Sequence, residues 1–207
     1  HGVTWLDWNT DGWPDLYTSR GAFRGRGERS NRLHVNREGR TFEQADVPAV
    51  LDNARGRGRS ATPWDLNGDG RLDLMILNFH DEGRPQRLAL SAPGGHRDAA
   101  RETGWHDLRA NTVTAFRLGG GTAFVLSGNG RDAGRILRRD EQGRFVDVTA
   151  RAGIALEPGK SVTAVAVGDV DNDGDDDLYY VRAAGDAQGA NVADGVLSFF
   201  YARRHRE

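Results

Sequence analysis

Three short acidic segments of the chain carry the residue types that bind a divalent cation. The segments DWNTDGWPDL (7–16), DLNGDGRLDL (65–74) and DVDNDGDDDL (169–178) share the pattern D-x-[DN]-x-D-G-x-x-D-L. Ca²⁺ is a hard cation that takes about six to eight oxygen ligands, so a short loop must bring several oxygens to one point. Alternate residues of an acidic loop can do this. The three segments therefore predict up to three bound Ca²⁺ ions.

We number each loop from its first aspartate, as positions 1 to 9. Positions 1, 3, 5 and 9 are predicted to supply side-chain oxygens, and position 7 its backbone carbonyl. The predicted ligands are Asp7, Asn9, Asp11, Trp13 and Asp15 in the first loop, Asp65, Asn67, Asp69, Arg71 and Asp73 in the second, and Asp169, Asp171, Asp173, Asp175 and Asp177 in the third. Position 6 is glycine in every loop, because the chain must turn sharply there and a positive φ is easiest without a Cβ.

Two alternatives to this interpretation were weighed. An EF-hand shares the first half of the pattern but needs a bidentate glutamate at position 12, where this chain has Thr18, Ile76 and Tyr180. Asp, Asn and Gly also form Asx-turns that bind no metal, and a single copy would leave that alternative open. Three copies with the same four side-chain positions favour metal binding, because the crowded carboxylates would repel one another without a cation.

The segments around the loops predict the elements that position them. A small or β-branched stretch precedes each loop (GVTWL, SATPW, SVTAVAVG) and an apolar stretch follows it (YTS, MILN, YYVR), so each loop joins the two strands of a hairpin. A second hairpin with a glycine-containing turn is predicted at 31–46 and 134–149, with a weaker copy at 86–98 and the opening of a fourth at 196–207. Four strands in about 50 residues is the plan of a propeller blade.

The spacing of the loops reveals a further repeat. Asp7 and Asp65 are 58 residues apart and Asp65 and Asp169 are 104 apart, so a repeat without a metal loop is expected halfway. Residues 100–116 parallel 150–165, and Gly119-Gly120-Gly121 stand where the acidic loop should follow. We therefore predict one all-β domain, a β-propeller of about four blades or part of a larger one, with repeats at approximately 1–58, 59–110, 111–160 and 161–207.

At these residues the chain resembles the FG-GAP/VCBS repeat family, the calcium-loop propeller blades also found in integrin α-subunit heads. The runs NRLHVNREGRTFEQAD and GRSATPWDLNGDGRLDLMILN resemble the bacterial proteins that carry these repeats next to an ASPIC/UnbV domain. The resemblance covers nearly the whole chain. It implies an extracytoplasmic module, periplasmic, at the cell surface or secreted, that mediates contacts rather than chemistry. The chain departs from the family in its loop-less third repeat and in having fewer than the usual seven or so blades.

Composition excludes several other classes of function. A formal net charge of −2 offers no broad attraction to nucleic acid or anionic lipid, so the arginine-glycine segments at 20–30 and 54–60 are interpreted as solvated loops. The chain has no cysteine, and therefore no disulfide, thiolate metal site or cysteine nucleophile. Its six histidines show no H-E-x-x-H motif, and no run of about 18 apolar residues predicts a membrane span.

These observations favour a non-catalytic calcium-binding propeller that serves as a protein-interaction, accessory or structural subunit. The alternative is a carbohydrate-binding lectin, or the propeller scaffold of a carbohydrate-active enzyme, that uses Trp8, Trp13 and loop arginines. Trp5 and Trp64 lie in predicted inner strands, where packing between blades is expected. His80-Asp81-Glu82 and His106-Asp107 follow strand ends, where acid and base groups could stand, and solvated loops explain them better.

Overall fold

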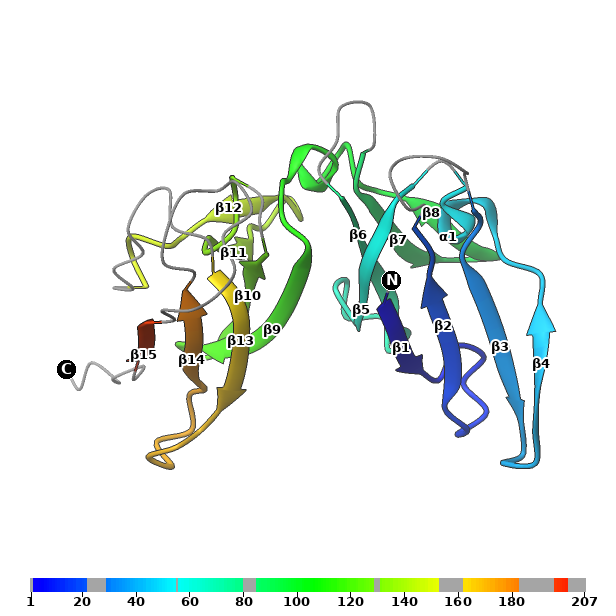
Figure 1. Cartoon of the computed structure of the whole chain (residues 1–207), viewed down its shortest axis with the longest axis horizontal. Helices are drawn as coiled ribbons and strands as arrows, with labels where there is room; N and C mark the ends of the chain where they lie inside the picture. The colour runs from blue at the N-terminus through cyan, green and yellow to red at the C-terminus, as the bar shows by residue number, and fades with distance from the viewer. Residues whose placement is uncertain are drawn as a thin grey trace. The chain divides into compact units, whose positions relative to one another are not determined.

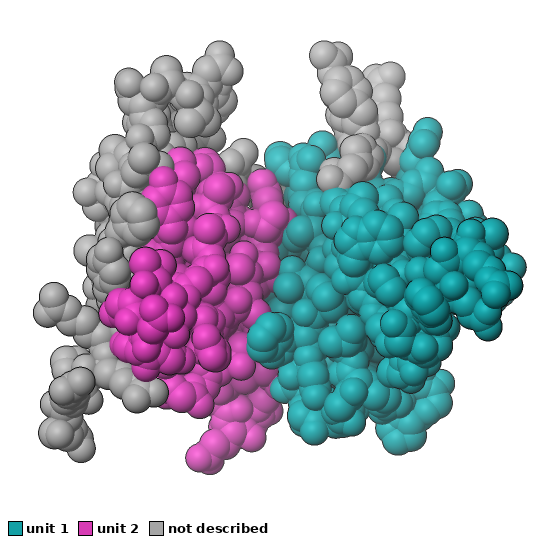
Figure 2. Space-filling model, turned by 90° about the horizontal axis from the view of Figure 1, so that it is seen from below, with its two compact units in different colours: residues 1–108 teal, residues 109–207 magenta. Residues whose placement is uncertain are grey.

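The computed structural model describes residues 2–21, 29–54, 56–79, 85–128, 131–152, 162–182 and, for the backbone, 196–200. The described chain is all-β (Figure 1), with antiparallel pairing throughout its sheets. It divides into two compact units, residues 1–108 and 109–207 (Figure 2). No helix in the described part is long and apolar enough to cross a membrane. Most of the arginine-glycine segment at 20–30, and His80-Asp81-Glu82, lie outside the described residues.

The first unit holds two four-stranded sheets whose strands follow chain order. The first sheet consists of β1 (Gly2–Leu6), β2 (Asp15–Ser19), β3 (Arg32–Arg37) and β4 (Thr41–Ala45), and the second of β5 (Gly58–Trp64), β6 (Asp73–Asn78), β7 (Arg87–Ala92) and β8 (Gly95–Asp98). A one-turn helix, α1 (Ala49–Asp52), lies between the two sheets in sequence, and a short 3₁₀ helix, η2 (Trp105–Asp107), follows β8. Each sheet is thus two successive hairpins, as one propeller blade requires.

The second unit also holds two sheets, one of four strands and one with three strands described. Its first sheet consists of β9 (Thr112–Leu118), β10 (Gly121–Ser127), β11 (Ile136–Arg139) and β12 (Phe145–Asp147), and its second of β13 (Val162–Gly168), β14 (Asp177–Arg182) and β15 (Val196–Phe200). The all-β fold with propeller-type blades that the sequence predicts is therefore confirmed, with four sheets in the described chain.

Each unit is held together by apolar side chains from its two sheets. The core of the first unit contains Leu6, Tyr17, Leu33 and Val35 of the first sheet, Ala61, Leu74, Ile76 and Ala89 of the second, and Leu51 of α1. The core of the second unit contains Phe116, Ala123, Val125 and Ile136 of its first sheet and Val162, Leu178 and Tyr180 of its second. Positions 10 and 12, counted from the acidic loops, contribute in both units: Leu74 and Ile76, then Leu178 and Tyr180.

The alternation of side chains along β1 explains which residues enter the core. Leu6 is buried and the Thr4 hydroxyl donates to the Ala61 carbonyl at 2.6 Å, so this face of β1 lies against β5. Val3 and Trp5 point to the opposite face, because successive side chains of a strand alternate. Trp5 is 57% exposed and its ring lies 5.9 Å from that of Phe42 in the same sheet. It therefore does not occupy the packed position between sheets that its place in an inner strand suggested.

The third repeat closes its inner hairpin with glycine alone. Leu118 pairs with Gly121, so only Gly119 and Gly120 lie between β9 and β10. Their φ angles are 53° and 73°, and two-residue hairpin loops favour two such positive values because the resulting twist matches that of the strands. The turn has no acidic residue, as the sequence alignment of the repeats indicates.

A buried hydrogen-bond network ties the first sheet to α1. The Tyr17 hydroxyl donates to the Leu51 carbonyl at 2.6 Å and accepts from Asn31 Nδ2 at 2.7 Å, while Asn31 Oδ1 accepts from the Arg20 amide at 2.7 Å. Burial raises the pKa of Tyr17 above its ordinary value, because the charged phenolate would lose its hydration. The network satisfies polar groups in a region where an unpaired one would be costly.

The first prediction is that Tyr17→Phe lowers the free energy of unfolding by about 1–2 kcal/mol at neutral pH, because a buried hydrogen-bonding hydroxyl is lost. Urea unfolding measures this. The raised pKa of Tyr17 contributes stability that is complete below pH ~10 and is lost as pH rises above it, since only the unfolded chain ionises there. The unfolding free energy of the wild type should therefore fall more steeply than that of Tyr17→Phe above pH ~10; parallel curves would contradict the buried network.

Candidate metal-binding loops

The three acidic loops occupy the same place in three of the four sheets. They connect β1 to β2, β5 to β6 and β13 to β14, which are the first two strands of each sheet. Position 9 is in each case the first residue of the second strand: Asp15, Asp73 and Asp177. Each loop is therefore anchored at its end by strand pairing, with Leu6 opposite Asp15, Trp64 opposite Asp73 and Gly168 opposite Asp177.

The position 1 carboxylate organises the turn of each loop. One oxygen accepts from the amide of position 5, at 3.1 Å for Asp7, 3.2 Å for Asp65 and 3.1 Å for Asp169. The other oxygen accepts from the glycine amide at position 6, at 2.9, 2.9 and 3.0 Å respectively. The loop backbone therefore wraps around this one carboxylate in the same way three times.

The side chains at positions 3 and 5 repeat a second pair of contacts. The Oδ1 atoms of Asn9, Asn67 and Asp171 accept from the position 5 amide at 3.2, 3.1 and 3.2 Å. The position 5 carboxylates Asp11, Asp69 and Asp173 accept from the position 7 amide, at 2.9 Å in all three loops. An aspartate at position 3 of the third loop thus keeps the contact with the position 5 amide but cannot donate to the position 5 carboxylate, as the asparagines of the first two loops do.

Position 4 is a backbone requirement that our sequence reasoning missed. Its residue has a positive φ in every loop, 58° for Thr10, 73° for Gly68 and 57° for Asn172, in addition to 86°, 79° and 94° for the glycines at position 6. Glycine and asparagine are the usual signals for this left-handed conformation, while a β-branched threonine is an outlier there. Gly68 and Asn172 are residues that indicate a positive φ at position 4 of the second and third loops. Thr10 gives no such indication in the first loop.

The position 9 carboxylates are buried and accept hydrogen bonds from backbone amides. Asp15 and Asp73 are 0% exposed and Asp177 is 5% exposed. Asp15 accepts from the Trp8 amide at 2.9 Å and from the Asn36 amide of β3 at 2.7 Å, and Asp73 accepts from Leu66 and from Ser91 of β7, both at 2.6 Å. Asp177 accepts from the position 2 amide of Val170 at 2.8 Å. This side chain therefore closes the loop, and in the first unit it also joins the loop to the third strand.

The donor set of the third loop fits a hard divalent cation. Asp169, Asp171 and Asp177 each place a carboxylate oxygen so that all three lie within 4.8 Å of one another, the one such acidic group among the residues that the structure describes. Three convergent carboxylate oxygens in a solvent-accessible loop are the ligands that Ca²⁺ prefers. The carboxylate of Asp173, a predicted ligand, lies outside this group and faces the Asp175 amide. In the first two loops the side-chain oxygen of an asparagine, Asn9 or Asn67, stands at position 3 in place of the Asp171 carboxylate.

Comparison with known families identifies the repeat that carries these loops. The family described as FG-GAP-like repeat matches residues 7–76 and 120–180, which together make up more than half of the chain. The chain belongs to this family. The first match spans the first two acidic loops, and the second begins in the glycine turn of the third repeat and spans the third loop. No curated protein matches the chain.

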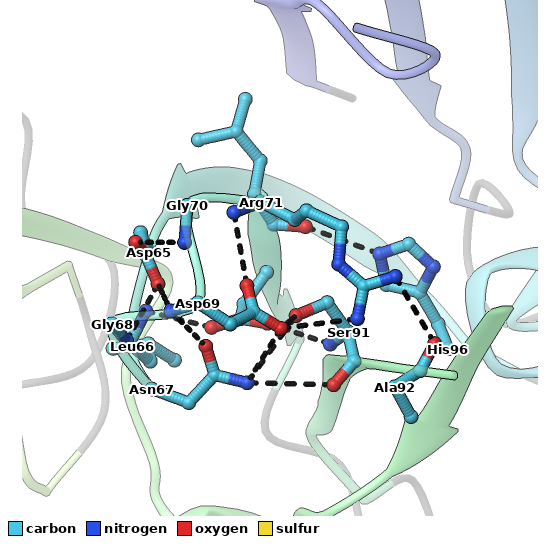
Figure 3. A network of polar contacts seen from close by, with 12 residues as sticks. Asp65, Leu66, Asn67, Gly68, Asp69, Gly70, Arg71, Ser91, Ala92 and His96 are labelled. Carbon is cyan, nitrogen blue, oxygen red and sulfur yellow. Dashed lines mark hydrogen bonds and ion pairs between the residues drawn. The ribbon is translucent and has the colours of Figure 1, made fainter. Parts of the chain in front are cut away.

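The second loop of this FG-GAP-like chain has contacts from Ser91 and Arg71 that have no counterpart in the other two loops among the described residues (Figure 3). Asp69 Oδ2 accepts from Ser91 Oγ at 2.6 Å, from Arg71 Nη2 at 3.1 Å and from Asn67 Nδ2 at 3.2 Å. Arg71 Nη1 donates to the Ala92 carbonyl at 3.2 Å. The Ser91 hydroxyl, with smaller contributions from Arg71 and Asn67, holds the pKa of Asp69 well below its usual range. The loop is thereby tied to the β7–β8 hairpin.

An arginine of the loop-less repeat lies against the third loop. Arg117 of β9 approaches Asp176, at position 8, with Nη2 2.9 Å and Nε 3.2 Å from Oδ1, and its amide donates to Oδ2 at 2.7 Å. The Asp176 amide in turn donates to the Arg117 carbonyl at 3.2 Å. The guanidinium lowers the pKa of Asp176, because it favours the ionised carboxylate. Sequence analysis missed this pair, which is 59 residues apart in the chain.

The tryptophans of the first loop have different surroundings. Trp8 stacks on His96 of β8, with ring centroids 4.3 Å apart, and packs against the core of the first unit. Trp13 is 42% exposed and lies against the β3–β4 turn, where a Cβ added to Gly39 would come within 2.8 Å of its ring. The ring of Trp8 is therefore largely covered by other side chains of the protein, whereas the ring of Trp13 is accessible for stacking on a sugar.

The second prediction separates the structural role of position 9 from ligand binding. In the presence of a chelator, Asp15→Ala should lower the free energy of unfolding by about 2–4 kcal/mol, because two amides lose a buried carboxylate partner. Asp11→Ala, at an exposed position of the same loop, should cost less than about 1 kcal/mol under the same conditions. Equal losses in urea unfolding would show that the buried carboxylate does not hold the loop.

The third prediction concerns Arg117. Removal of its ion pair by Arg117→Gln should lower the melting temperature by about 1–3 °C in low salt with chelator present, and by less in about 1 M NaCl, where exposed pairs are screened. Arg37→Gln is the matched control, because it breaks an exposed pair with Glu43 inside a single hairpin. An effect of Arg117→Gln that is no larger than the control would contradict a role in anchoring the third loop.

Proposed function

We propose that this chain is a non-catalytic, calcium-stabilised FG-GAP-like module that serves as an interaction or accessory subunit of an extracytoplasmic assembly. The observation that carries the proposal is the threefold repetition of one loop geometry, together with the convergent oxygens of Asp169, Asp171 and Asp177. Five backbone-to-side-chain contacts recur in all three loops, between positions 1 and 5, 1 and 6, 3 and 5, 5 and 7, and 9 and 2. Such repetition is expected where each loop meets the same ligand.

In this proposal the side chains at positions 1, 3, 5 and 9 and the carbonyl at position 7 would hold the cation, whose positive charge would offset that of the clustered carboxylates. The residues of the chain do the rest. Backbone amides pre-orient the position 1 and position 3 oxygens, and the buried position 9 carboxylate fixes the loop to its strands. Neutralising clustered carboxylates removes their mutual repulsion, so occupancy stabilises the inner hairpin of each blade by mass action.

The proposed compartment and partner rest on the family. FG-GAP repeats are typical of extracellular proteins, where loops of moderate Ca²⁺ affinity are occupied because free Ca²⁺ is plentiful. The chain offers no net charge suited to nucleic acid, and we propose a protein partner bound by the loops or sheet faces. Recovery of such a partner by pull-down from the envelope fraction, dependent on Ca²⁺, is the result that supports this part.

A carbohydrate-binding function is the second candidate, and the exposed ring of Trp13 favours it. A flat aromatic side chain that is 42% exposed beside a glycine turn can stack on a sugar ring. A glycan array tests this candidate. Micromolar sugar binding that Trp13→Ala abolishes would support this candidate. An array on which no sugar binds would favour the protein-interaction module instead.

The fourth prediction is metal dependence. At a free Ca²⁺ concentration of about 100 times Kd, one occupied site adds about 2.7 kcal/mol to the free energy of unfolding. Chelation should therefore lower the melting temperature by at least about 5 °C, and added Ca²⁺ should restore it. Mg²⁺ should substitute poorly, because it demands strict octahedral geometry with shorter metal–oxygen distances.

The stoichiometry of this response has its own check. Elemental analysis should find at most three Ca²⁺ per chain from these loops, and Asp171→Ala should remove one of them. An unchanged melting curve after verified metal removal would count against the whole proposal. A fourth ion bound beside Gly119 to Gly121 would show that the repeats are misaligned.

A further inference from the structure

The three loops share one backbone geometry but differ in the charge that surrounds their carboxylates. Positions 1 to 9 of the first loop contain three aspartates and no basic residue, those of the second contain three aspartates and Arg71, and those of the third contain six aspartates. The third loop has its additional aspartates at positions 3, 7 and 8, and position 7 carries a different kind of side chain in each loop. It is Trp13 in the first loop, Arg71 in the second and Asp175 in the third.

Arg71 is directed back onto a carboxylate of its own loop. Its guanidinium is held at both ends, with Nη2 3.1 Å from Asp69 Oδ2 and Nη1 3.2 Å from the Ala92 carbonyl (Figure 3). Both loops have a neutral donor at this oxygen: Asn67 Nδ2 donates to Asp69 Oδ2 at 3.2 Å, and Asn9 Nδ2 donates to Asp11 Oδ2 at 2.8 Å. The guanidinium is therefore an addition in the second loop. The second loop therefore carries its own positive group at the place where a bound cation would need the position 5 carboxylate.

Ser91 strengthens this arrangement. Its amide donates to the buried Asp73 carboxylate and its hydroxyl donates to Asp69, both at 2.6 Å, so one residue of β7 joins positions 5 and 9 of the loop. At the equivalent place in the first sheet, the Asn36 amide donates to Asp15, while its side chain donates to the Pro14 carbonyl and accepts from the Gly39 amide. The first loop thus has no β3 side chain on its position 5 carboxylate among the contacts of the described residues.

We propose that Arg71 is an internal competitor for the cation at the second loop, which keeps this loop closed without metal and makes it the weakest of the three calcium sites. This inference rests on the proposed function. A cation that binds the second loop must displace the guanidinium from Asp69 and overcome its charge, whereas the described contacts of the first loop include no such group. In the third loop the guanidinium of Arg117 pairs with Asp176, which is not a predicted ligand, and further carboxylates are added at positions 3 and 7. The expected order of affinity is the third loop, then the first, then the second.

Calorimetric titration of Ca²⁺ into the metal-free chain tests the proposal. The wild type should show three sites, and Asp69→Ala should remove the weakest one. Arg71→Gln should tighten that weakest site by about five- to tenfold, because one opposing charge is removed while the position 7 carbonyl stays. Arg71→Lys retains the charge and should remain within about twofold of the wild type. Arg97→Gln is the matched control, since it removes the same charge from an exposed pair with Glu102.

Thermal unfolding distinguishes competition from a merely structural role. If Arg71 competes, Arg71→Gln should lower the melting temperature in chelator, where the tether to Ala92 is lost, and should enlarge the stabilisation produced by Ca²⁺. If Arg71 only tethers the hairpins, the melting temperature falls equally with and without Ca²⁺, and the proposal is overturned. If the wild type binds three Ca²⁺ ions and Arg71→Gln leaves the affinity of the weakest site unchanged, this inference alone is overturned. A wild type that binds no Ca²⁺ at any loop overturns the proposed function as well.

Discussion

The buried carboxylate at position 9 is the contact on which the acidic loops depend. It lies at the start of the second strand of each loop-bearing sheet, and Asp15 and Asp73 are wholly inaccessible to solvent. A buried carboxylate is tolerated only where donors replace its hydration, and each of these two has one amide from its own loop and one from the third strand. The loop, the inner hairpin and the first strand of the outer hairpin, near that strand's end, are thus joined by a single side chain. Where the third repeat lacks that side chain, the hairpin closes through two glycines instead.

The differences among the loops arise outside this shared frame. Position 7 and the nearest residue of a neighbouring strand decide how the position 5 carboxylate is engaged, as the contacts of Asp69 with Arg71 and Ser91 illustrate. Arg117, which is 59 residues from Asp176 in the sequence, forms an ion pair with Asp176 of the third loop. Asp176 is not a predicted ligand. The backbone geometry is therefore conserved among the repeats of this one chain, while the electrostatic surroundings are set separately for each loop. Such separation lets the charge around one loop change without a change in fold.

Sequence alone predicted the hairpins, the glycine turn and the place of the loops in the sheets, because these follow from local patterns. Strand alternation and the D-x-[DN]-x-D-G spacing are read within about ten residues, and the contacts of positions 1, 3 and 5 lie within that span. The pairs Arg117–Asp176 and Asp69–Ser91 were not predicted, because they join residues 59 and 22 apart whose approach depends on strand register and sheet packing. The exposure of Trp5 was missed for a similar reason. Its strand was recognised, but which face of the strand meets the neighbouring sheet is a tertiary property.

The equivalence of the core positions in the two units bears on how such a chain can arise. Leu74 and Ile76 follow the second loop at the same spacing as Leu178 and Tyr180 follow the third, and each pair lies in the core shared by two adjacent sheets. A blade copied by tandem gene duplication therefore brings with it a surface that already fits the blade before it. Growth or loss of whole repeats would then require little change at the new junction, whereas an unrelated strand pair would not bring such a surface with it. A lineage built from such units can vary its length in steps of one blade while selection acts separately on each loop.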